Sequence, residues 1–372
     1  MSETIRYCCP CHFGLESVLS FEIKRIGGEN LTVTDGRISF DGDIRMAAKA
    51  NICLATAERV LIELGSFHAD SFEELFQGVK GLPLERYISR LDAFPVKGHS
   101  LKSKLYSIPD CQSIVKKAAV ERLKSVYGVS IFEETGAVCR IQFNILKDVA
   151  TIYLDTSGEG LHKRGYRRNS NDAPIKETLA AGIIDLAHVR GDSVVADPMC
   201  GSGTLIIEAA YKALRIAPGL KRGFVAEQWE SIPKAQWSEE REAAREAIAK
   251  ENRFRGIASD IDSFAADLTA RNVKFAGVAP RITVSRADIC EYKPQPGVIT
   301  VCNPPYGERM LELKQAEELY KKMGQALHPS KDNPCYIICA HEEFEKFFGK
   351  KADKKRKLYN GMLKCQLYMY YN

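Results

Sequence analysis

Four consecutive residues, Asn303, Pro304, Pro305 and Tyr306, follow the apolar run 298–302 and have the chemistry to hold a flat base. Each proline lacks a backbone donor and keeps the residue before it out of the helical region, so the tetrapeptide predicts a rigid corner at a strand end. The Asn303 side-chain oxygen and the Pro304 carbonyl can accept both hydrogens of an exocyclic amine while the Tyr306 ring covers the base. The tetrapeptide alone fits equally well a proline-rich loop that closes a buried strand.

A second polar loop, residues 197–204, joins an expected strand to an expected helix. Gly201 and Gly203 let the backbone approach a ligand closely, and the following helix supplies free N–H groups. Neither the third glycine of a dinucleotide loop nor the Gly-Lys-Ser/Thr of a phosphate loop follows. Asp197 ends the strand, where it would repel a pyrophosphate and favour a cation. We expect a ligand to contact Asp197, Pro198, Met199, Cys200, Gly201, Ser202, Gly203 and Thr204.

Acids end two further expected strands, at Asp260-Ile261 and at Asp288-Ile289. Asp260 could accept hydrogen bonds from both hydroxyls of a ribose, and Asp288 could accept the amine of an adenine. Each acid alone could instead cap a helix or a turn, as could Asp262. Because the carboxyl ends of parallel strands share one edge of a sheet, acids at successive strand ends predict a nucleoside site there.

The elements that carry these residues alternate regularly between strand and helix from about residue 176 to residue 339. Such alternation predicts a doubly wound α/β sheet that is parallel in most of its strands. An insertion at 217–250 interrupts it with both tryptophans and a charged helix near Ser238. Asn360-Gly361 lies between two strand-like runs and predicts a terminal hairpin, which would add an antiparallel strand to the sheet.

The first 157 residues read as two smaller α/β units with a boundary near residue 59. In the second unit we expect a strand that begins at 95–96, a polar loop at 98–105, a helix at 110–127, and a hairpin from 137–146 and 149–154. Two basic clusters fall in or after it, at 96–124 and 161–168. The first could be only a solvated helix face, but the second interleaves one aromatic ring with basic residues, a mix that suits single-stranded nucleic acid. Expected nucleic-acid contacts are Lys102, Lys104, Lys116, Lys117, His162, Lys163, Arg164, Tyr166, Arg167 and Arg168.

Composition narrows the class of protein without identifying it. The chain has 372 residues, a net charge of +5 and a pI near 8.5, which permits a nucleic-acid partner without requiring one. There is neither an apolar run of the roughly 18 residues that span a membrane nor a signal-peptide core at the N-terminus, so we expect a cytoplasmic protein. Cys8, Cys9, Cys11 and His12 have the types of metal ligands, but no second set accompanies them. We therefore expect free thiols and no metal.

The order of glycine loop, ribose acid, adenine acid and Asn-Pro-Pro-Tyr resembles that of class I S-adenosylmethionine-dependent methyltransferases acting on exocyclic amines. The closer resemblance is to the bacterial THUMP-containing RNA guanine-N2 methyltransferases, in particular to the N-terminal half of the fused large-subunit rRNA enzyme. It covers essentially the whole chain and is carried by GLHKRGYR at 160–167, APIKETLAA at 173–181, and the segments 197–204 and 303–309.

This resemblance implies a ferredoxin-like unit over 1–58, a THUMP RNA-binding domain over 59–157, a basic linker over 158–172 and a Rossmann-like methyltransferase domain over 173–372. It implies that S-adenosylmethionine is the cofactor, with S-adenosylhomocysteine as the product. The implied cofactor residues are those of 197–204 with Asp260, Ile261, Asp288, Ile289 and Asn303, and the implied catalytic residues are Asn303, Pro304, Pro305 and Tyr306.

The implied reaction is methylation of the N2 amine of a guanosine in RNA, with 23S rRNA as the first substrate to consider. The chain contains one such methyltransferase domain where the fused enzyme has two, which leaves room for a tRNA substrate. The same tetrapeptide serves adenine-N6 methylation of DNA, although a DNA enzyme needs no THUMP-like unit. A non-catalytic RNA-binding factor is a third alternative, against which the intact glycine loop and tetrapeptide argue. Glu308 and Arg309 could read the guanine edge or a phosphate, or form a surface ion pair. We assign no general base and expect no obligate protein partner.

Overall fold

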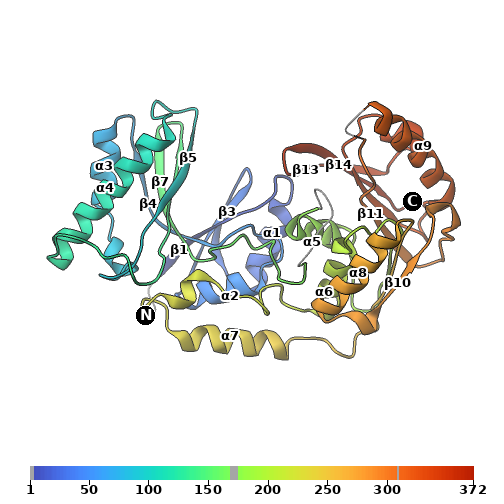
Figure 1. Ribbon diagram of the computed structural model, residues 1–372, viewed down its shortest axis with the longest axis horizontal. Helices are drawn as coiled ribbons and strands as arrows, with labels where there is room; N and C mark the ends of the chain where they lie inside the picture. Colours follow the sequence, from blue (N-terminus) through green and yellow to red (C-terminus); the bar gives the residue numbers. More distant parts are fainter. Residues whose placement is uncertain (1–3, 168–174, 308–309) are drawn as a thin grey trace.

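Two seven-stranded sheets organise the protein in the computed structural model, which describes residues 4–167, 175–307 and 310–372. In Figure 1 the first sheet lies to the left and centre and the second to the right, with the C-terminus in the second. Within the described residues no helix is apolar over a length that could cross a membrane.

The first sheet has the strand order β2-β3-β1-β4-β7-β6-β5, so the two N-terminal units share one sheet. The contact between them is short, because β1 pairs with β4 only at Tyr7 opposite Ile62 and at Cys8 opposite Leu61. Its elements are β1 (Ile5–Pro10), α1 (Glu16–Arg25), β2 (Glu29–Thr34), β3 (Arg37–Gly42), α2 (Arg45–Cys53), β4 (Leu61–His68), α3 (Phe72–Lys80), η1 (Leu84–Arg86), β5 (Val96–Leu101), α4 (Ile108–Tyr127), β6 (Ile141–Leu146) and β7 (Val149–Asp155).

One expected loop is partly a strand. Residues 98–101, assigned from their polarity to a loop over 98–105, belong to β5 and run parallel to β6. A Cβ atom at Gly98 would come within 2.4 Å of the Phe143 carbonyl oxygen, so glycine permits this close approach. The strand expected to begin at residue 137 begins instead at Ile141. The hairpin between β6 and β7 is confirmed.

The second sheet has the strand order β10-β9-β8-β11-β12-β14-β13. Strands β8 to β12 are parallel, and β14 pairs antiparallel with both β12 and β13, which confirms the expected terminal hairpin. Gly361 (φ 62°) lies in its turn. The elements of this half are α5 (Glu177–Leu186), β8 (Val194–Asp197), α6 (Thr204–Leu214), η2 (Val225–Gln228), α7 (Lys234–Glu246), β9 (Arg255–Asp260), α8 (Ser263–Ala276), η3 (Ala279–Arg281), β10 (Ile282–Arg286), η4 (Ile289–Glu291), β11 (Val298–Cys302), α9 (Met310–Leu327), β12 (Cys335–Cys339), α10 (Phe344–Phe348), β13 (Lys354–Asn360) and β14 (Leu363–Tyr370).

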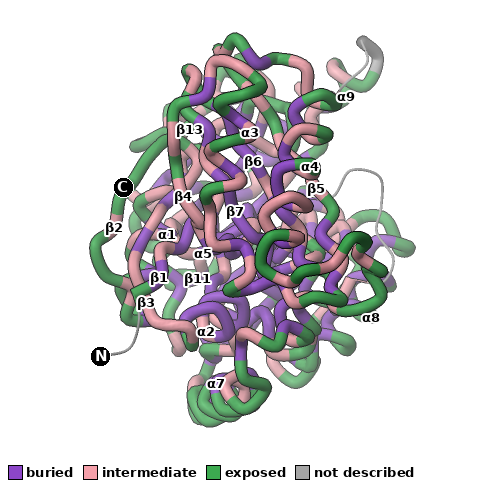
Figure 2. The backbone as a smooth tube through the Cα atoms, turned by 90° about the vertical axis from the view of Figure 1, so that its left-hand side faces the viewer, coloured by how far each residue is buried: buried purple, intermediate pink, exposed green. Residues whose placement is uncertain are grey.

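Helices cover both faces of the second sheet. Side chains of α5 and α6 form one apolar cluster with β8 and β11, and those of α9 and α10 form another with β12 and β14. The insertion reaches back to the first half, because Trp229 and Trp237 are buried in the core of the first sheet. In Figure 2, α2 and α5 are largely buried, whereas β2 and much of α7 are exposed.

Candidate active site

The glycine loop has a conformation that requires its glycines. Gly201 (φ 53°) and Gly203 (φ 79°) both have positive φ, which side chains rarely allow. A Cβ atom at Gly203 would come within 2.8 Å of the Thr269 Cγ2 atom, so α8 can pack here only against glycine. A Cβ atom at Gly201 would meet nothing within 4 Å. Gly201 therefore faces open space, whereas Gly203 faces a helix.

Helix α8 holds this loop from behind. The Thr269 hydroxyl donates to the Gly201 carbonyl at 2.9 Å, and the Asn272 amide donates to the Ser202 carbonyl at 2.9 Å. Both side chains are buried. Because hydrogen bonds shielded from water exchange less readily with solvent, the loop is held in one position before any ligand arrives.

Asp260 is oriented by the backbone. Its Oδ2 atom accepts the Gly201 N–H at 2.9 Å and its Oδ1 atom accepts the Asp262 N–H at 3.0 Å. Each carboxylate oxygen has further acceptor capacity, so Asp260 can still receive one donor on each oxygen. The helix cap is Asp262, which accepts the Phe264 N–H at 2.9 Å.

Asp288 lies after the third of these strands, at the start of η4. Its Oδ1 atom accepts the Cys290 N–H at 2.9 Å, and this backbone hydrogen bond holds the pKa of the carboxyl below its ordinary value. The capping alternative therefore applies to Asp288. Asp288 nevertheless lines the same cavity as Asp260.

Asp197 is buried at the end of β8. Burial, together with a smaller effect of the nearby charge of Asp260, raises the pKa of its carboxyl to about 8. The Met199 N–H donates to its Oδ1 atom at 3.4 Å and lowers this pKa in part. A cation close to the Asp197 carboxylate would therefore stabilise its ionised form.

The Asn-Pro-Pro-Tyr corner follows β11 as expected, but its hydrogen bonds add a feature. The Tyr306 hydroxyl donates to the Asn303 Oδ1 atom at 2.6 Å, and the Tyr320 hydroxyl donates to the Pro305 carbonyl at 2.8 Å. The Tyr306 ring packs between the two apolar clusters of the sheet, and burial raises the pKa of its phenol well above the usual value. Tyr306 thus fixes the orientation of the Asn303 amide. Glu308 and Arg309 lie outside the described residues.

One cavity of about 560 Å³ collects these groups at the carboxyl edge of the second sheet. All of the cofactor and catalytic residues named from the sequence line it, apart from Gly203, which is turned toward α8. Acidic and apolar side chains line the cavity together, which suits a nucleoside that carries a positive charge. Sequence reasoning missed Ile175, Leu205, Ala265, Leu319, Lys322 and Asn360, and did not give Asp262 a place in the site. Only Asn360 had a local signal, as the first residue of the Asn-Gly turn.

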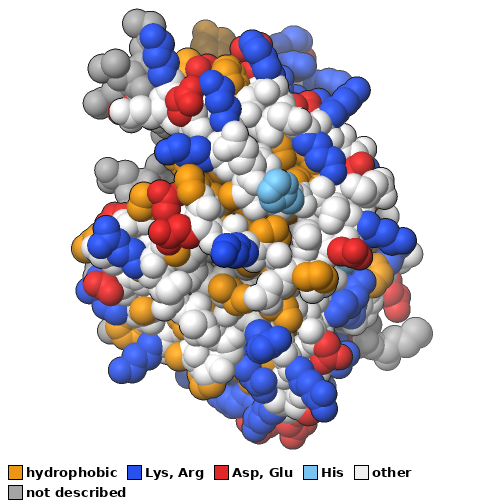
Figure 3. Space-filling view, turned by 90° about the vertical axis from the view of Figure 1, so that its right-hand side faces the viewer, with side chains coloured by type: hydrophobic (Ala, Val, Ile, Leu, Met, Phe, Trp, Pro, Cys, Tyr) orange, Lys and Arg blue, Asp and Glu red, His pale blue; other side chains and the backbone are white. Residues whose placement is uncertain are grey.

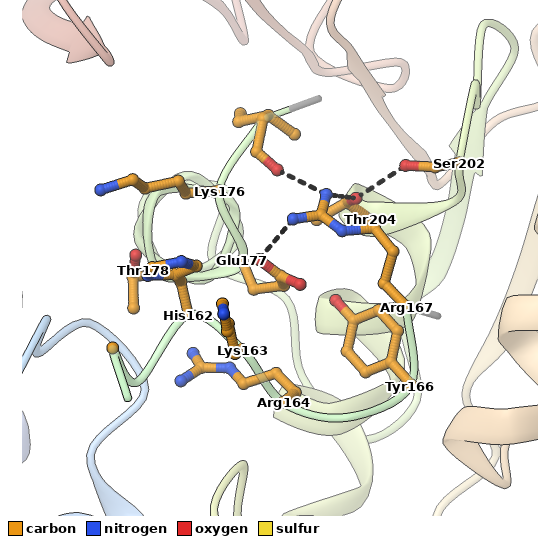
Figure 4. Close-up of polar contacts among 12 residues, drawn as sticks. His162, Lys163, Arg164, Tyr166, Arg167, Lys176, Glu177, Thr178, Ser202 and Thr204 are labelled. Atoms are coloured by element: carbon orange, nitrogen blue, oxygen red, sulfur yellow. Dashed lines mark hydrogen bonds and ion pairs between the residues drawn. The ribbon is translucent and has the colours of Figure 1, made fainter. Parts of the chain in front are cut away.

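The basic segment 161–167 differs from expectation (Figure 4). Arg164 is 3% exposed, donates to the Leu161 carbonyl at 2.6 Å and lies 3.5 Å from Glu208. The Tyr166 hydroxyl donates to the same Glu208 at 3.0 Å, and its ring is buried. This burial contradicts the expectation that Arg164 and Tyr166 contact nucleic acid, because both side chains lie inside the protein and are directed to partners there.

Arg167 joins the cavity wall to the glycine loop (Figure 4). Its Nη1 atom donates to the Ile175 carbonyl at 3.1 Å and to the Thr204 hydroxyl at 3.2 Å, and its Nη2 atom donates to Glu177 at 2.8 Å. Burial raises the pKa of Glu177 to about 7, opposed by the charge of Arg167. Ile175 and Thr204 both line the cavity, so the geometry makes Arg167 a positioning residue in place of the expected nucleic-acid contact.

The remaining expected nucleic-acid contacts lie at or near the surface. Lys102 and Lys117 are exposed, while Lys104 pairs with Asp70 at 2.5 Å, Lys116 with Glu134, and Lys163 with Glu159 at 2.8 Å. Burial lowers the pKa of His162 to about 4, so this ring is neutral at pH 7. Arg168 lies outside the described residues. These lysines stay candidates for phosphate contacts.

The cysteines near the N-terminus are free thiols. Cys8, Cys9 and Cys11 are buried, and burial raises the pKa of Cys11 to about 12. Over the residues that the structure describes, no group of three or more His, Cys, Asp or Glu side chains is arranged to hold a metal ion.

Three family models match consecutive parts of the chain. They are a RlmL ferredoxin-like domain over residues 6–61, a THUMP domain over 69–155 and an RMKL-like methyltransferase domain over 164–369. The last covers more than half of the chain and contains the whole of the cavity described above. The chain belongs to this methyltransferase family.

Relatives of this methyltransferase extend over its whole length. YpsC of Bacillus subtilis, provisionally named an RNA methyltransferase, is 43% identical over 96% of this chain and 94% of its own. Ribosomal RNA large subunit methyltransferase K/L of Psychromonas ingrahamii is 32% identical over 98% of this chain, which spans only 50% of that protein.

Two solved structures share the complete fold. One, described as a predicted N6-adenine-specific DNA methylase from Listeria monocytogenes, is 40% identical with a TM-score of 0.94 over 100% of this chain and 97% of its own. The other, SMU.472, provisionally named a methyltransferase and complexed with SAH, is 38% identical with a TM-score of 0.94 over 100% of this chain and 99% of its own. The names of these relatives thus include both RNA and DNA as substrates.

Proposed function

We propose that this methyltransferase transfers a methyl group from S-adenosylmethionine to the exocyclic N2 amine of a guanosine in RNA, with 23S rRNA as the substrate. The observation that carries the proposal is one cavity that contains both a backbone-held carboxylate, Asp260, and the Asn303 corner. A carboxylate with one acceptor site left on each oxygen suits a ribose diol, and a fixed amide suits a base amine.

The cofactor part of the proposal rests on Asp197, Asp260 and Asp288. When bound, S-adenosylmethionine supplies an electrophilic methyl group on a positively charged sulfur. Asp260 would accept the two ribose hydroxyls and Asp288 the adenine amine. Asp197 would be held ionised by the positive charge, against the burial that raises its pKa. The complex of SMU.472 with SAH supports this choice of cofactor.

The base part rests on Asn303. One acceptor site of its Oδ1 atom is taken by the Tyr306 hydroxyl, and the other can accept a hydrogen of the target amine. The Pro304 carbonyl would accept the second hydrogen. A guanine amine is a poor nucleophile, because its lone pair is delocalised into the ring, and alignment of two bound reactants can lower a barrier by up to about 7–11 kcal/mol. The proton can leave to water after transfer, so no base is assigned.

The RNA part rests on the THUMP match and on the surface lysines. Lys102, Lys104, Lys116, Lys117 and Lys163 would contact phosphates, and the target guanosine would have to be unpaired or flipped to reach the cavity. The choice of 23S rRNA is supported by the large subunit methyltransferase relatives. Guanine over adenine is supported by the resemblance of residues 303–309, chiefly of the continuation Gly307-Glu308-Arg309.

The experiment uses the purified enzyme, tritiated S-adenosylmethionine and total RNA from a strain that lacks the gene. The RNA is separated into 23S, 16S and tRNA fractions before nucleoside analysis. The proposal predicts label in N2-methylguanosine from 23S rRNA. Label in tRNA would show that the substrate is tRNA and not 23S rRNA. Label in N6-methyladenosine of an added DNA duplex, with none in RNA, would contradict the proposal and favour the DNA alternative.

A further inference from the structure

A short basic segment, residues 350–357, holds as much formal charge as the whole chain. It contains six Lys or Arg residues and one Asp, a formal charge of +5, which equals the net charge of all 372 residues. On the face shown in Figure 3, basic side chains lie among acidic ones and apolar patches. The excess positive charge of the chain is thus concentrated in one place in the sequence.

Three of the six basic side chains are engaged by the protein itself. Lys350 donates to the Pro329 carbonyl at 2.7 Å, Lys355 to Glu345 at 2.7 Å, and Arg356 to the Gly14 carbonyl at 3.0 Å. The other three, Lys351, Lys354 and Lys357, are exposed and form no ion pair with any described residue. These three are available to an anionic partner.

The segment leads into the cavity. Its last four residues begin β13, the edge strand of the second sheet, and β13 ends at Asn360, which lines the cavity. At a rise of about 3.3 Å per residue, Lys357 lies about 10 Å and Lys354 about 20 Å along the strand from Asn360. Lys354 and Lys357 lie on opposite faces of β13, because side chains alternate along a strand, and both flank the outer edge of the sheet. A chain of phosphates that runs from the cavity along this edge would therefore meet both lysines.

Aromatic rings accompany the lysines where β13 meets the first half of the protein. The Phe13 and Tyr359 rings pack edge to face with centroids 6.0 Å apart. The Lys357 Nζ atom lies 5.7 Å from the first centroid and 5.3 Å from the second. Phe13 is 41% exposed, so part of its side chain is accessible to a base. Aromatic rings beside basic side chains suit single-stranded nucleic acid.

We propose that the RNA strand next to the methylated nucleotide runs along β13, with phosphates on Lys351, Lys354 and Lys357 and a base on Phe13. The inference rests on the proposed function, because it requires that RNA is the substrate. It adds a contact surface outside the THUMP domain. The surface joins the ferredoxin-like unit, which contributes Phe13, to the cavity, which begins at Asn360.

The test is a triple variant, Lys351→Gln, Lys354→Gln and Lys357→Gln, measured for RNA affinity over a range of salt concentrations. Three lost phosphate contacts predict an affinity about 10- to 100-fold weaker at about 0.1 M salt and a salt slope smaller by about 2. Calorimetric affinity for S-adenosylmethionine should be unchanged, since none of the three lysines lines the cavity. An RNA affinity and salt slope equal to those of the wild type would overturn the proposal.

A charge-matched control removes three exposed basic residues near the amino end of β9 in the same sheet: Lys250→Gln, Arg253→Gln and Arg255→Gln. This end of β9 lies away from the cavity, which is at the carboxyl edge. The control should change RNA affinity by less than about threefold. An equal loss in the control would show that only total charge matters, and would overturn the proposal.

The stacking contact has its own pair of variants. Phe13→Ala should weaken RNA binding by about tenfold, while Phe21→Ala, which removes a still more exposed ring on α1, should not. Equal effects would remove Phe13 from the proposal. The two proposals fail separately, because a wild-type enzyme that methylates no RNA contradicts the proposed function, whereas normal methylation by the triple variant contradicts only the β13 surface.

Discussion

The carboxyl edge of the second sheet and the segment 161–167 contain similar sets of charged and aromatic side chains, yet they use them differently. At the sheet edge, backbone N–H groups hold Asp260 and leave each oxygen able to accept one more donor. In the segment, Arg164 donates to the Leu161 carbonyl and lies beside Glu208, to which the Tyr166 hydroxyl donates. Arg167 directs its guanidinium to Glu177, Thr204 and the Ile175 carbonyl. The first arrangement can bind a ligand, and the second holds the protein together.

Residue type alone therefore does not mark a binding site. What matters is whether the hydrogen-bonding capacity of a polar group is used up inside the protein. Backbone donors fix a side chain from one side and leave its other side able to bind a ligand. An ion pair between two buried side chains leaves neither partner able to do so. Variants of residues in the two regions test whether they differ in this way.

The largest effect is expected for Asn303→Ala. Loss of the amide removes the acceptor that positions the target amine, and we expect methyl transfer at least about 10³-fold slower. Affinity for S-adenosylmethionine should stay within about threefold in calorimetry, because the acids at the strand ends are intact. Tyr306→Phe is the matched intermediate: it keeps the ring but frees the amide, and should give a smaller loss. A near-normal rate for Asn303→Ala would contradict the mechanism.

The next largest effect is expected for Asp260→Ala. Two charged hydrogen bonds to a ribose are worth about 1.5–3 kcal/mol each, so cofactor affinity should fall by about 10²-fold or more. Asp262→Ala is the control two residues away. It removes a helix cap, which costs about 1 kcal/mol of stability. Asp262 lines the same cavity but directs an oxygen to the Phe264 N–H, so its loss should lower cofactor affinity much less than the loss of Asp260. If the two variants bind the cofactor equally, Asp260 is a structural residue like its neighbour.

A moderate effect is expected for Arg167→Lys. Lysine keeps the charge but cannot reach Glu177, Thr204 and the Ile175 carbonyl together. We expect cofactor affinity about tenfold weaker, since two of these partners line the cavity, with an unchanged salt slope of RNA binding. The exposed Lys163→Gln should do the reverse, with normal cofactor affinity and a slope smaller by about 0.7. Normal cofactor affinity in Arg167→Lys would contradict this positioning role.

The smallest effect is expected for Asp197, as a change in the pH dependence of stability. Its folded pKa of about 8 lies above the ordinary value of 3.8, so between these pH values the folded state keeps a proton that the unfolded state has lost. The contribution is complete below about pH 4 and is lost as the pH rises through about 8, at no more than about 1.4 kcal/mol per pH unit. Asp197→Asn should flatten the fall of the unfolding free energy between about pH 5 and 8 in the cofactor-free protein. A parallel pH profile would contradict this.

The sequence predicted the second sheet well because its signals are local. Strand ends followed by acids, glycines or prolines identify one edge of a parallel sheet, and an Asn-Gly pair identifies a hairpin. The first sheet was harder. The loop expected over 98–105 is half strand, because Gly98 lies against Phe143 on β6, a contact invisible in the local pattern.

Contacts between residues far apart in the sequence also explain which site residues were missed. Lys322 and Leu319 line the cavity from α9, and no local pattern relates that helix to β8. Likewise Arg164 and Tyr166 resemble surface residues because their partner, Glu208, is about forty positions away on α6. Burial of a polar residue depends on such distant partners, so it follows from the fold and not from the segment.

A crystal structure of the enzyme with S-adenosylhomocysteine would test most directly whether the carboxyl edge of the second sheet binds the cofactor. We expect both ribose hydroxyls within about 3 Å of the Asp260 oxygens, the adenine amine beside Asp288, and the sulfur facing Asn303. The contradicting result is equally clear. S-adenosylhomocysteine would lie elsewhere, for example in the second cavity of about 690 Å³ beside Phe21, Lys212 and Tyr211, with Asp260 free of contact.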